Sequence, residues 1–178
     1  MNIAQTYLAD CANGAGTRLS VFVSGCTNHC PGCFNPETWD FSYGVPYTEE
    51  IEEFILMQLK KPYYRGVSFL GGEPMEFENQ RGLAGLIRKI REQMPEKDIW
   101  IYTGFLYADL LPGGKQYCEV TDEILDGIDI LVDGPFMQEK KNLRLRFRGS
   151  ENQRIIDMKR TREAGKVVLS QDSQDFKF

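Results

Sequence analysis

The chain has 178 residues, of which 42% are hydrophobic and 26% are charged, which is ordinary for a globular protein. This length suffices for a sizeable core, so we expect one domain over residues 1–178. A formal net charge of −5 argues against nucleic acid as a partner. No apolar run approaches the roughly 20 residues that cross a bilayer, which argues against a membrane protein.

The N-terminal residues and the cysteines indicate a reducing compartment. Residues 1–5 lack the basic region and the apolar stretch of a secretory signal peptide. The five cysteines are an odd number, and three of them share one short loop, which does not suit a secreted disulfide framework. We therefore expect a cytoplasmic protein.

Apolar strand-like runs alternate with helical patterns along the chain. Strands are predicted at residues 19–23, 66–70, 98–102 and 128–132. Helices are predicted at residues 48–61, 80–94 and 121–125. Thr48 and Thr121 suit the N-cap positions of the first and third helices.

Strand–helix–strand units predict parallel pairing with right-handed crossovers. The strands are short and almost continuously apolar, as expected when both faces of a sheet are covered. About four strands are too few for a closed eight-stranded barrel. The predicted fold class is therefore α/β, as an open, partial (β/α) barrel with a mostly parallel sheet, whose open side can admit a large partner.

A turn whose residues can bind a ligand follows each predicted strand. These turns are the segment that begins at Cys26, the Gly71-Gly72-Glu73 turn, Thr103-Gly104, and Asp133-Gly134. Ligands of parallel α/β folds bind at the C-terminal ends of the strands. We therefore expect the four turns to meet at one edge of the sheet.

The first turn holds Cys26, Cys30 and Cys33, whose spacing lets three thiolates converge on one inorganic group. Because no fourth cysteine is nearby, a [4Fe–4S] cluster held here would keep one iron open to a small molecule. The spacing leaves two alternatives open, a dithiol pair and a zinc site completed by Cys11 or Cys118.

The second turn, Gly71-Gly72-Glu73-Pro74, suits a cationic guest. The two glycines let a ligand approach the backbone closely, and Pro74 restricts Glu73 to an extended conformation. Peptide carbonyls and a carboxylate are all acceptors, so an amino group is the natural ligand. The alternative is an ordinary tight turn.

Two other segments carry weaker signals. Gly14 and Gly16 fit either a phosphate-binding loop or a turn that enters the first strand. Apolar and basic side chains alternate within residues 142–154, which predicts a strand with one apolar and one cationic face. Such a strand is either a charged edge that resists aggregation or a docking surface for an acidic or polar partner segment. Its basic residues are Arg144, Arg146 and Arg148.

The cysteine loop and the Gly-Gly-Glu-Pro turn resemble the two signatures of radical S-adenosylmethionine enzymes, in the expected order and after successive strands. Within that superfamily the chain is similar to the group that activates anaerobic (class III) ribonucleoside-triphosphate reductase, a glycyl-radical enzyme. The similarity covers nearly the whole chain, in residues 13–18, 24–39, 71–74, 132–136 and 148–154.

The resemblance implies one [4Fe–4S] cluster per chain, held by Cys26, Cys30 and Cys33. The open iron chelates the amino and carboxylate groups of S-adenosylmethionine, and no side chain is catalytic beyond these two cofactors. Many superfamily members have an aromatic residue before the third cysteine, where this chain has Gly32. Phe34 or another aromatic residue is therefore expected to pack on the adenine.

The resemblance also assigns the other turns. Gly71, Gly72 and Glu73 hold the amino group of S-adenosylmethionine, whereas Thr103 and Gly104 face its ribose or methionyl end.

The implied reaction needs two protein partners. One electron from the reduced cluster cleaves the S–C5′ bond, and the resulting 5′-deoxyadenosyl radical takes a hydrogen atom from a glycine Cα of the anaerobic ribonucleoside-triphosphate reductase. An external one-electron donor such as a flavodoxin reduces the cluster. The C-terminal segment of about residues 140–178 is expected to take part in docking the reductase.

Two other classes of function remain compatible with the sequence. The first is a radical enzyme that acts on a small molecule, similar to 7-carboxy-7-deazaguanine synthase, or that activates another glycyl-radical enzyme. The second is a zinc-stabilised interaction module without enzymatic activity.

Overall fold

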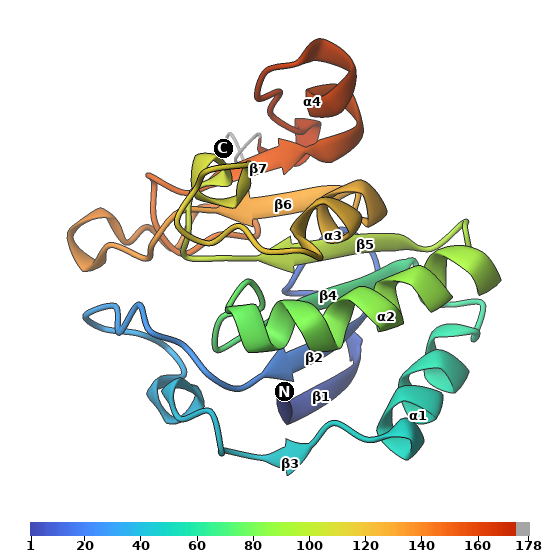
Figure 1. The fold of residues 1–178 in the computed structure, drawn as a ribbon. Coiled ribbons are helices and arrows are strands. Elements are labelled where there is room, and N and C mark those ends of the chain that lie inside the picture. The colour runs from blue at the N-terminus through green and yellow to red at the C-terminus, as the bar shows by residue number, and fades with distance from the viewer. Residues whose placement is uncertain (174–178) are drawn as a thin grey trace.

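The computed structural model describes residues 1–173, which form a seven-stranded sheet and four α-helices (Figure 1). The strands are β1 (Asn2–Asp10), β2 (Arg18–Val23), β3 (Val45–Pro46), β4 (Gly66–Gly71), β5 (Asp98–Tyr102), β6 (Ile130–Asp133) and β7 (Arg154–Asp157). The helices are α1 (Glu49–Leu59), α2 (Phe77–Gln93), α3 (Thr121–Gly127) and α4 (Met158–Ala164). The strand order is β3-β1-β2-β4-β5-β6-β7, so the sheet is not closed.

The centre of the sheet is parallel, as the alternation of strands and helices predicted. Strand β2 pairs with β4, β4 with β5, and β5 with β6, always in parallel. The C-terminal ends of these four strands therefore lie at one edge, on the left of Figure 1. The α/β class and the parallel centre are confirmed.

Three strands were not predicted from the sequence, and each of them pairs antiparallel with its neighbour. Strands β1 and β3 extend the sheet beyond β2, and β7 extends it beyond β6. Strand β1 has two register irregularities against β2, whereas β3 has only two residues and β7 four. Such strands show neither clean alternation nor a continuous apolar run. The expectation of about four strands is wrong, and the sheet is mixed.

The helices lie close to their predicted positions. Helix α1 follows Thr48, which takes the N-cap position without a side-chain capping hydrogen bond. Helix α2 begins at Phe77 rather than at Gln80, because the turn after β4 leads directly into it. Helix α3 begins at the predicted Thr121, with Val120 as its N-cap instead. Within residues 1–173, no helix combines the length and the apolar character that crossing a membrane requires.

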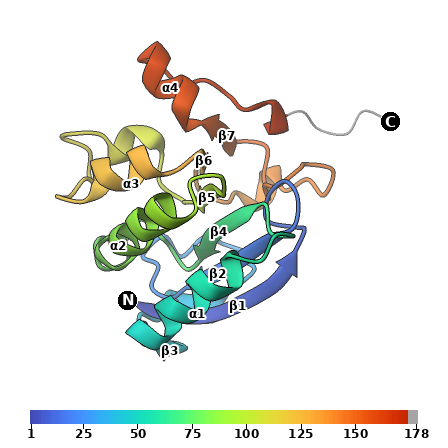
Figure 2. The same cartoon turned by 90° about the vertical axis from the view of Figure 1, so that its right-hand side faces the viewer.

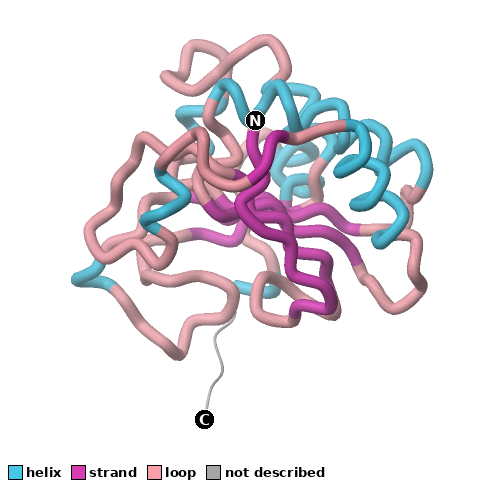
Figure 3. The backbone as a smooth tube through the Cα atoms, turned by 90° about the horizontal axis from the view of Figure 1, so that it is seen from below, coloured by secondary structure: helices cyan, strands magenta, loops and turns pink. Residues whose placement is uncertain are grey.

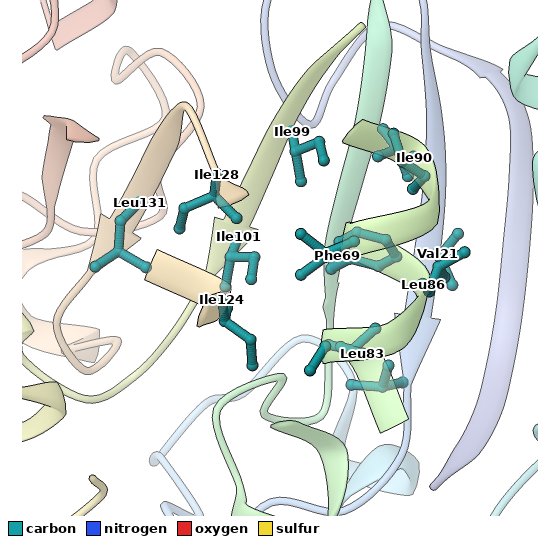
Figure 4. Close-up of a cluster of buried hydrophobic side chains, with 14 of the residues drawn as sticks. Val21, Phe69, Leu83, Leu86, Ile90, Ile99, Ile101, Ile124, Ile128 and Leu131 are labelled. Carbon is teal, nitrogen blue, oxygen red and sulfur yellow. The ribbon is translucent and has the colours of Figure 1, made fainter. Parts of the chain in front are cut away.

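Helices α1, α2 and α3 cover one face of the sheet, and loops cover much of the other (Figures 2 and 3). The larger apolar core lies between the sheet and these helices. Figure 4 shows Leu83, Leu86 and Ile90 of α2 facing Phe69 of β4 and Val21 of β2. All five side chains are fully buried or nearly so, and this burial fixes α2 across the parallel strands.

A second, smaller core on the other face contains a buried cation. The Arg18 side chain is 0% exposed, and its guanidinium lies 2.5 Å from a carboxylate oxygen of Asp98 and 5.0 Å from the centre of the Trp100 ring. It also donates to Ser68 Oγ and to the Val67 carbonyl, at 2.7 and 2.8 Å. These contacts compensate the cost of burying the charge.

The glycine-containing segment before β2 is a turn that this cation holds. Gly14 and Gly16 both have positive φ, at +126° and +78°, and the Arg18 guanidinium donates to the Ala15 carbonyl at 3.1 Å. Arg18 of this segment is buried inside the core. The structure therefore agrees with the interpretation of the segment as a turn that enters the first predicted strand, which is β2.

The strand predicted within residues 142–154 is wrong for most of its length. Only Arg154 belongs to a strand, and residues 142–149 form a loop that an isolated bridge between Lys141 and Ser150 closes. Phe147 has φ +53°, which breaks the extended alternation, and its ring packs edge-on against Trp100 at 5.5 Å. Residues 174–178 of the predicted docking segment lie outside the described residues.

Arg18 and Arg65 bind the same carboxylate from inside and outside the core, which allows a matched comparison. We expect Arg18→Met to lower the free energy of unfolding by about 3–5 kcal/mol, because it leaves Asp98 and two buried acceptors without their partner. Arg65 lies 2.9 Å from Asp98 with 57% of its side chain exposed, so Arg65→Met is expected to cost less than about 1 kcal/mol. Urea unfolding measures both, and equal losses would contradict this assignment.

Candidate functional site

A cavity of about 560 Å³ opens where the four parallel strands end. Its lining combines the turns after β2, β4, β5 and β6 with residues of the loop 142–149. All of the predicted site residues lie on it, namely Cys26, Cys30, Cys33, Gly71, Gly72, Glu73, Thr103 and Gly104. The parallel register of the strands therefore brings together turns that are as far apart in the sequence as Cys26 and Gly134.

The cysteine loop wraps tightly around its end of the cavity. Cys26 is buried, whereas Cys30 and Cys33 are partly exposed. The chain turns back at His29 and at Gly32, which have φ +43° and +73°, and the Cys33 N–H donates to the Cys30 carbonyl at 3.1 Å. The three thiols are therefore presented to one space from two short turns.

The chemistry of these thiols fits an iron–sulfur cluster. Burial raises the pKa of the Cys26 thiol to about 11, and burial also raises the pKa of Cys30. A bound cluster supplies the positive charge that deprotonates such thiols. Among residues 1–173 no three or more His, Cys, Asp or Glu side chains are arranged to hold a single metal ion. Cysteines of a cluster bind different irons, so they need not surround one ion.

The other cysteines lie away from this loop. Cys11 is exposed, and the Cys118 thiol lies 3.4 Å from the Gln80 amide oxygen at the interface of α2 and α3. The cavity lining includes neither of them. His29 is also exposed and stacks on Trp39, with 4.7 Å between the ring centres.

The Gly-Gly-Glu-Pro turn is bound to the segment that leads into the cysteine loop. The Gly72 N–H donates to the Val23 carbonyl and the Glu73 N–H to the Gly25 carbonyl, both at 2.8 Å. A Cβ at Gly72 would meet the carbonyl oxygens of Gly25 and Thr38 at 2.7 and 2.8 Å. Glycine is therefore required here by the close approach of two backbones, in addition to any approach of a ligand.

The Glu73 carboxylate is already hydrogen-bonded by its own chain. It accepts from the Gly104 N–H at 2.7 Å, from the Met75 N–H at 2.9 Å and from the Asn28 amide at 3.0 Å. The desolvation caused by burial raises the pKa of Glu73 to about 7, because its effect is larger than the opposite effect of the hydrogen bonds from Met75 and Gly104. The sequence predicted this carboxylate only as an acceptor for a ligand, whereas in the structure it also links three turns.

The turn after β5 supports that carboxylate. Gly104 supplies its N–H to Glu73, and a Cβ at Gly104 would approach the Asn28 amide nitrogen to 2.5 Å. The Thr103 hydroxyl accepts from the Phe105 N–H at 3.1 Å, and the Thr103 N–H donates to the Val132 carbonyl at 2.8 Å. Both residues line the cavity, with Gly104 in a structural role that the sequence did not reveal.

The comparisons with known proteins agree with this geometry. Residues 12–156 match the family described as a 4Fe-4S single cluster domain, a range that includes every predicted site residue. The chain is 41% identical over 157 residues to the anaerobic ribonucleoside-triphosphate reductase-activating protein of Vibrio cholerae, covering 87% of this chain and 97% of that protein.

Two further relatives carry the same name. The protein of Escherichia coli is 39% identical over 155 residues, covering 86% of this chain and 96% of that protein. The protein of Haemophilus influenzae is 39% identical over 157 residues, covering 87% and 97%. The chain belongs to the family of anaerobic ribonucleoside-triphosphate reductase-activating proteins. The 4Fe-4S match favours a cluster over the zinc-stabilised module that the spacing left open.

Three residues of this activating-protein site carried no signal in the sequence. Glu76 accepts hydrogen bonds from the Thr27 N–H at 2.9 Å and from the Thr27 hydroxyl at 2.6 Å. Asn79 donates to the carbonyls of Ser24 and Glu73, both at 2.9 Å. The third is Asn28, which bonds Glu73. Each of the three has a partner 45–55 residues away in the chain, so only the fold reveals these contacts.

The opposite wall of the cavity is the segment between β6 and β7. Asp133, which is fully buried, forms an ion pair with Arg154. Gln153 accepts from the N–H groups of Gly149 and Ser150 at 2.8 and 3.1 Å, and donates to the Gly134 carbonyl at 3.0 Å. Two of the stretches that carried the family resemblance thus interlock and fix the base of the loop.

The position before the third cysteine disfavours an aromatic side chain. Gly32 has φ +73°, which strains any residue with a side chain, and a Cβ there would displace the end of the exposed Gln138 side chain. Phe34 lies nearby on the wall of the cavity, with 61% of its surface exposed, and packs against Phe136 at 5.3 Å between ring centres. An aromatic surface is therefore present on the cavity, although not at residue 32.

The raised pKa of Glu73 predicts a pH dependence of stability in the cluster-free protein. Its pKa is about 7 in the folded chain and 4.5 in the unfolded chain, so its stabilising contribution is complete below pH 4.5 and is lost as the pH rises through 7. We expect the free energy of unfolding to fall by about 2–3 kcal/mol between pH 5 and pH 7.5. The other carboxyl groups with resolved shifts have lowered pKa values, so their effects lie at lower pH.

Chemical denaturation across this pH range measures the slope. Glu73→Gln removes the titrating group, and its stability is expected to be flat over the same range, whatever its absolute value. A wild-type curve that is flat or rises from pH 5 to pH 7.5 would contradict the raised pKa.

Proposed function

We propose that this chain generates a glycyl radical on an anaerobic ribonucleoside-triphosphate reductase, using a [4Fe–4S] cluster and S-adenosylmethionine. The observation that carries the proposal is the single cavity shared by three cysteines and the Gly-Gly-Glu-Pro turn. The names of the relatives supply the partner, because each is described as the activating protein of that reductase. When bound together and reduced, the two cofactors supply the 5′-deoxyadenosyl radical that takes the hydrogen atom.

We assign Cys26, Cys30 and Cys33 as the cluster ligands. They line one cavity, and their loop gives the cluster two partly exposed thiols and one buried thiol. The partly exposed side suits an external one-electron donor such as a flavodoxin, which must approach the cluster. We place the reaction in the cytoplasm, where reducing conditions keep these thiols available.

The Gly71-Gly72-Glu73 turn is assigned to the amino group of S-adenosylmethionine. Glu73 lines the cavity and has a carboxylate that is buried among neutral donors. A cationic amino group would offset the desolvation that raises its pKa. Thr103 and Gly104, on the neighbouring turn, are assigned to the ribose or methionyl end. Phe34, whose ring packs against Phe136, is assigned to pack on the adenine.

The mixed, unclosed sheet suits the open, partial barrel of radical S-adenosylmethionine enzymes. The cavity lies at the C-terminal ends of the parallel strands, where such enzymes bind their cofactors, and the sheet edges do not meet. In this arrangement the residues of the protein orient the cofactors and exclude water. A glycine-bearing segment of the reductase enters from the open side.

We further propose that residues 1–178 act as one domain whose segment from about residue 140 docks the reductase. Within residues 140–148 there are five basic residues and no acidic residue, in a chain of net charge −5. Leu143, in the loop that lines the cavity, is 88% exposed. A basic, partly apolar loop at the mouth of the cavity fits an acidic or polar partner segment.

The activity is tested with anaerobically reconstituted protein, S-adenosylmethionine, a one-electron reductant and the reductase. We expect about four irons per chain, 5′-deoxyadenosine among the products and a glycyl radical in the electron paramagnetic resonance spectrum. Cys26→Ala, Cys30→Ala and Cys33→Ala are each expected to lose the cluster and all cleavage, whereas Cys118→Ala is the matched control and keeps both. Absence of both the glycyl radical and 5′-deoxyadenosine from the wild type would reject the function.

Docking is tested with Arg144→Glu, because Arg146 and Arg148 also have interactions within the chain. Arg144 is exposed, so reversing its charge is expected to weaken binding to the reductase by about three- to tenfold without changing uncoupled cleavage of S-adenosylmethionine. Lys159→Glu makes the same charge change on α4 and should not affect binding. Isothermal titration calorimetry measures the affinities, and unchanged binding of Arg144→Glu would remove the loop from the interface.

A further inference from the structure

Two buried carboxylates hold consecutive residues of the cysteine loop. Thr27, directly after Cys26, donates its N–H and its hydroxyl to Glu76, at 2.9 and 2.6 Å. Asn28, the next residue, donates its amide to Glu73 at 3.0 Å. The two residues that follow the first cysteine are therefore held by acidic side chains from the segment between β4 and α2.

The two carboxylates differ in their access to a ligand. Glu73 lines the cavity, so a cationic guest can lie beside it. Glu76 is only 7% exposed and is not part of the cavity lining, and its second oxygen faces the Gln116 amide at 3.4 Å. Among the ion pairs of residues 1–173, none involves Glu76. Its negative charge is therefore held by neutral donors alone.

A fixed negative charge beside a cluster affects the electron that the cluster accepts. Reduction from the 2+ to the 1+ state adds one electron from an external one-electron donor and breaks no bond. A nearby carboxylate disfavours that added negative charge, most strongly where burial keeps water from screening it. Net charge and hydrogen bonding around a cluster are among the factors that set its potential.

We propose that Glu76 is a positioning residue that fixes the loop at Cys26 and whose charge lowers the reduction potential of the cluster. The proposal rests on the ligand assignment of Cys26 made above. Because Glu76 does not line the cavity, a cationic substrate can lie beside Glu73 without contacting Glu76. The lower potential makes the reduced cluster a stronger one-electron donor to the sulfonium substrate.

The test compares the midpoint potentials of Glu76→Gln and Glu78→Gln in the reconstituted protein. Glutamine keeps an oxygen that accepts from Thr27 and removes the charge. Glu78, two residues along, pairs with the N-terminal amine and has a side chain that is 60% exposed, so Glu78→Gln removes an equal charge from the surface. Redox titration followed by electron paramagnetic resonance gives each potential, with and without S-adenosylmethionine.

We expect a positive shift in Glu76→Gln that persists when S-adenosylmethionine is bound, and no shift in Glu78→Gln. Equal potentials in Glu76→Gln and the wild type, equal shifts in both variants, or a shift that disappears with S-adenosylmethionine would each overturn the proposal. If Glu76→Gln fails to retain iron, Glu76→Asp and Glu76→Asn give the same comparison, because they differ only in charge. The asparagine variant must then have the more positive potential.

The iron content of Cys26→Ala separates this proposal from the function on which it rests. A Cys26→Ala variant with a full complement of iron would overturn the ligand assignment itself. Equal potentials in the Glu76 variants and the wild type would overturn only the role of Glu76.

Discussion

The hydrogen bonds to the Glu73 carboxylate join three turns that the chain makes separately. The donors are the Gly104 N–H at the end of β5, the Asn28 amide in the cysteine loop after β2, and the Met75 N–H in the turn after β4. This shared acceptor adds to the backbone hydrogen bonds between neighbouring turns, such as those from Gly72 to Val23 and from Glu73 to Gly25. Because burial raises the pKa of this carboxylate, a cation beside it in the cavity would favour its charged form. Structural support and the ligand binding that we propose thus depend on the same side chain.

The parallel centre of the sheet makes this convergence possible. Strands β2, β4, β5 and β6 all point to the same edge, and α2 packs across them through a continuous apolar face. The opposite wall is built differently, because β7 returns antiparallel to β6 and its Arg154 pairs with the buried Asp133. That pair, with Gln153, attaches the basic loop of residues 142–149 to the rigid sheet. A cavity with one fixed wall and one loop wall suits a site that must hold small cofactors and also meet a large partner.

Charge is distributed unevenly around the cavity. Glu73 and Glu76 lie beside the cysteine loop, whereas the basic residues lie on the facing loop at the mouth. The buried acidic side suits a cationic sulfonium substrate and an electron donor of low potential, and the basic side suits an acidic partner segment. The chemistry that we propose moves an electron and a hydrogen atom, so it requires no side chain as an acid or base.

The sequence by itself determined the candidate site residues and the central strands. The spacing of Cys26, Cys30 and Cys33, the turn at Gly71-Gly72-Glu73 and the four apolar runs are local patterns, and local patterns can be read without a fold. Only the tertiary structure decided which partners those groups have. Glu76 finds Thr27 across 49 residues, and Phe147 takes φ +53° to pack against Trp100, so that the expected basic strand becomes a loop. The physical reason is that burial and long-range hydrogen bonds outweigh the weak local preference of a short polar segment for an extended conformation.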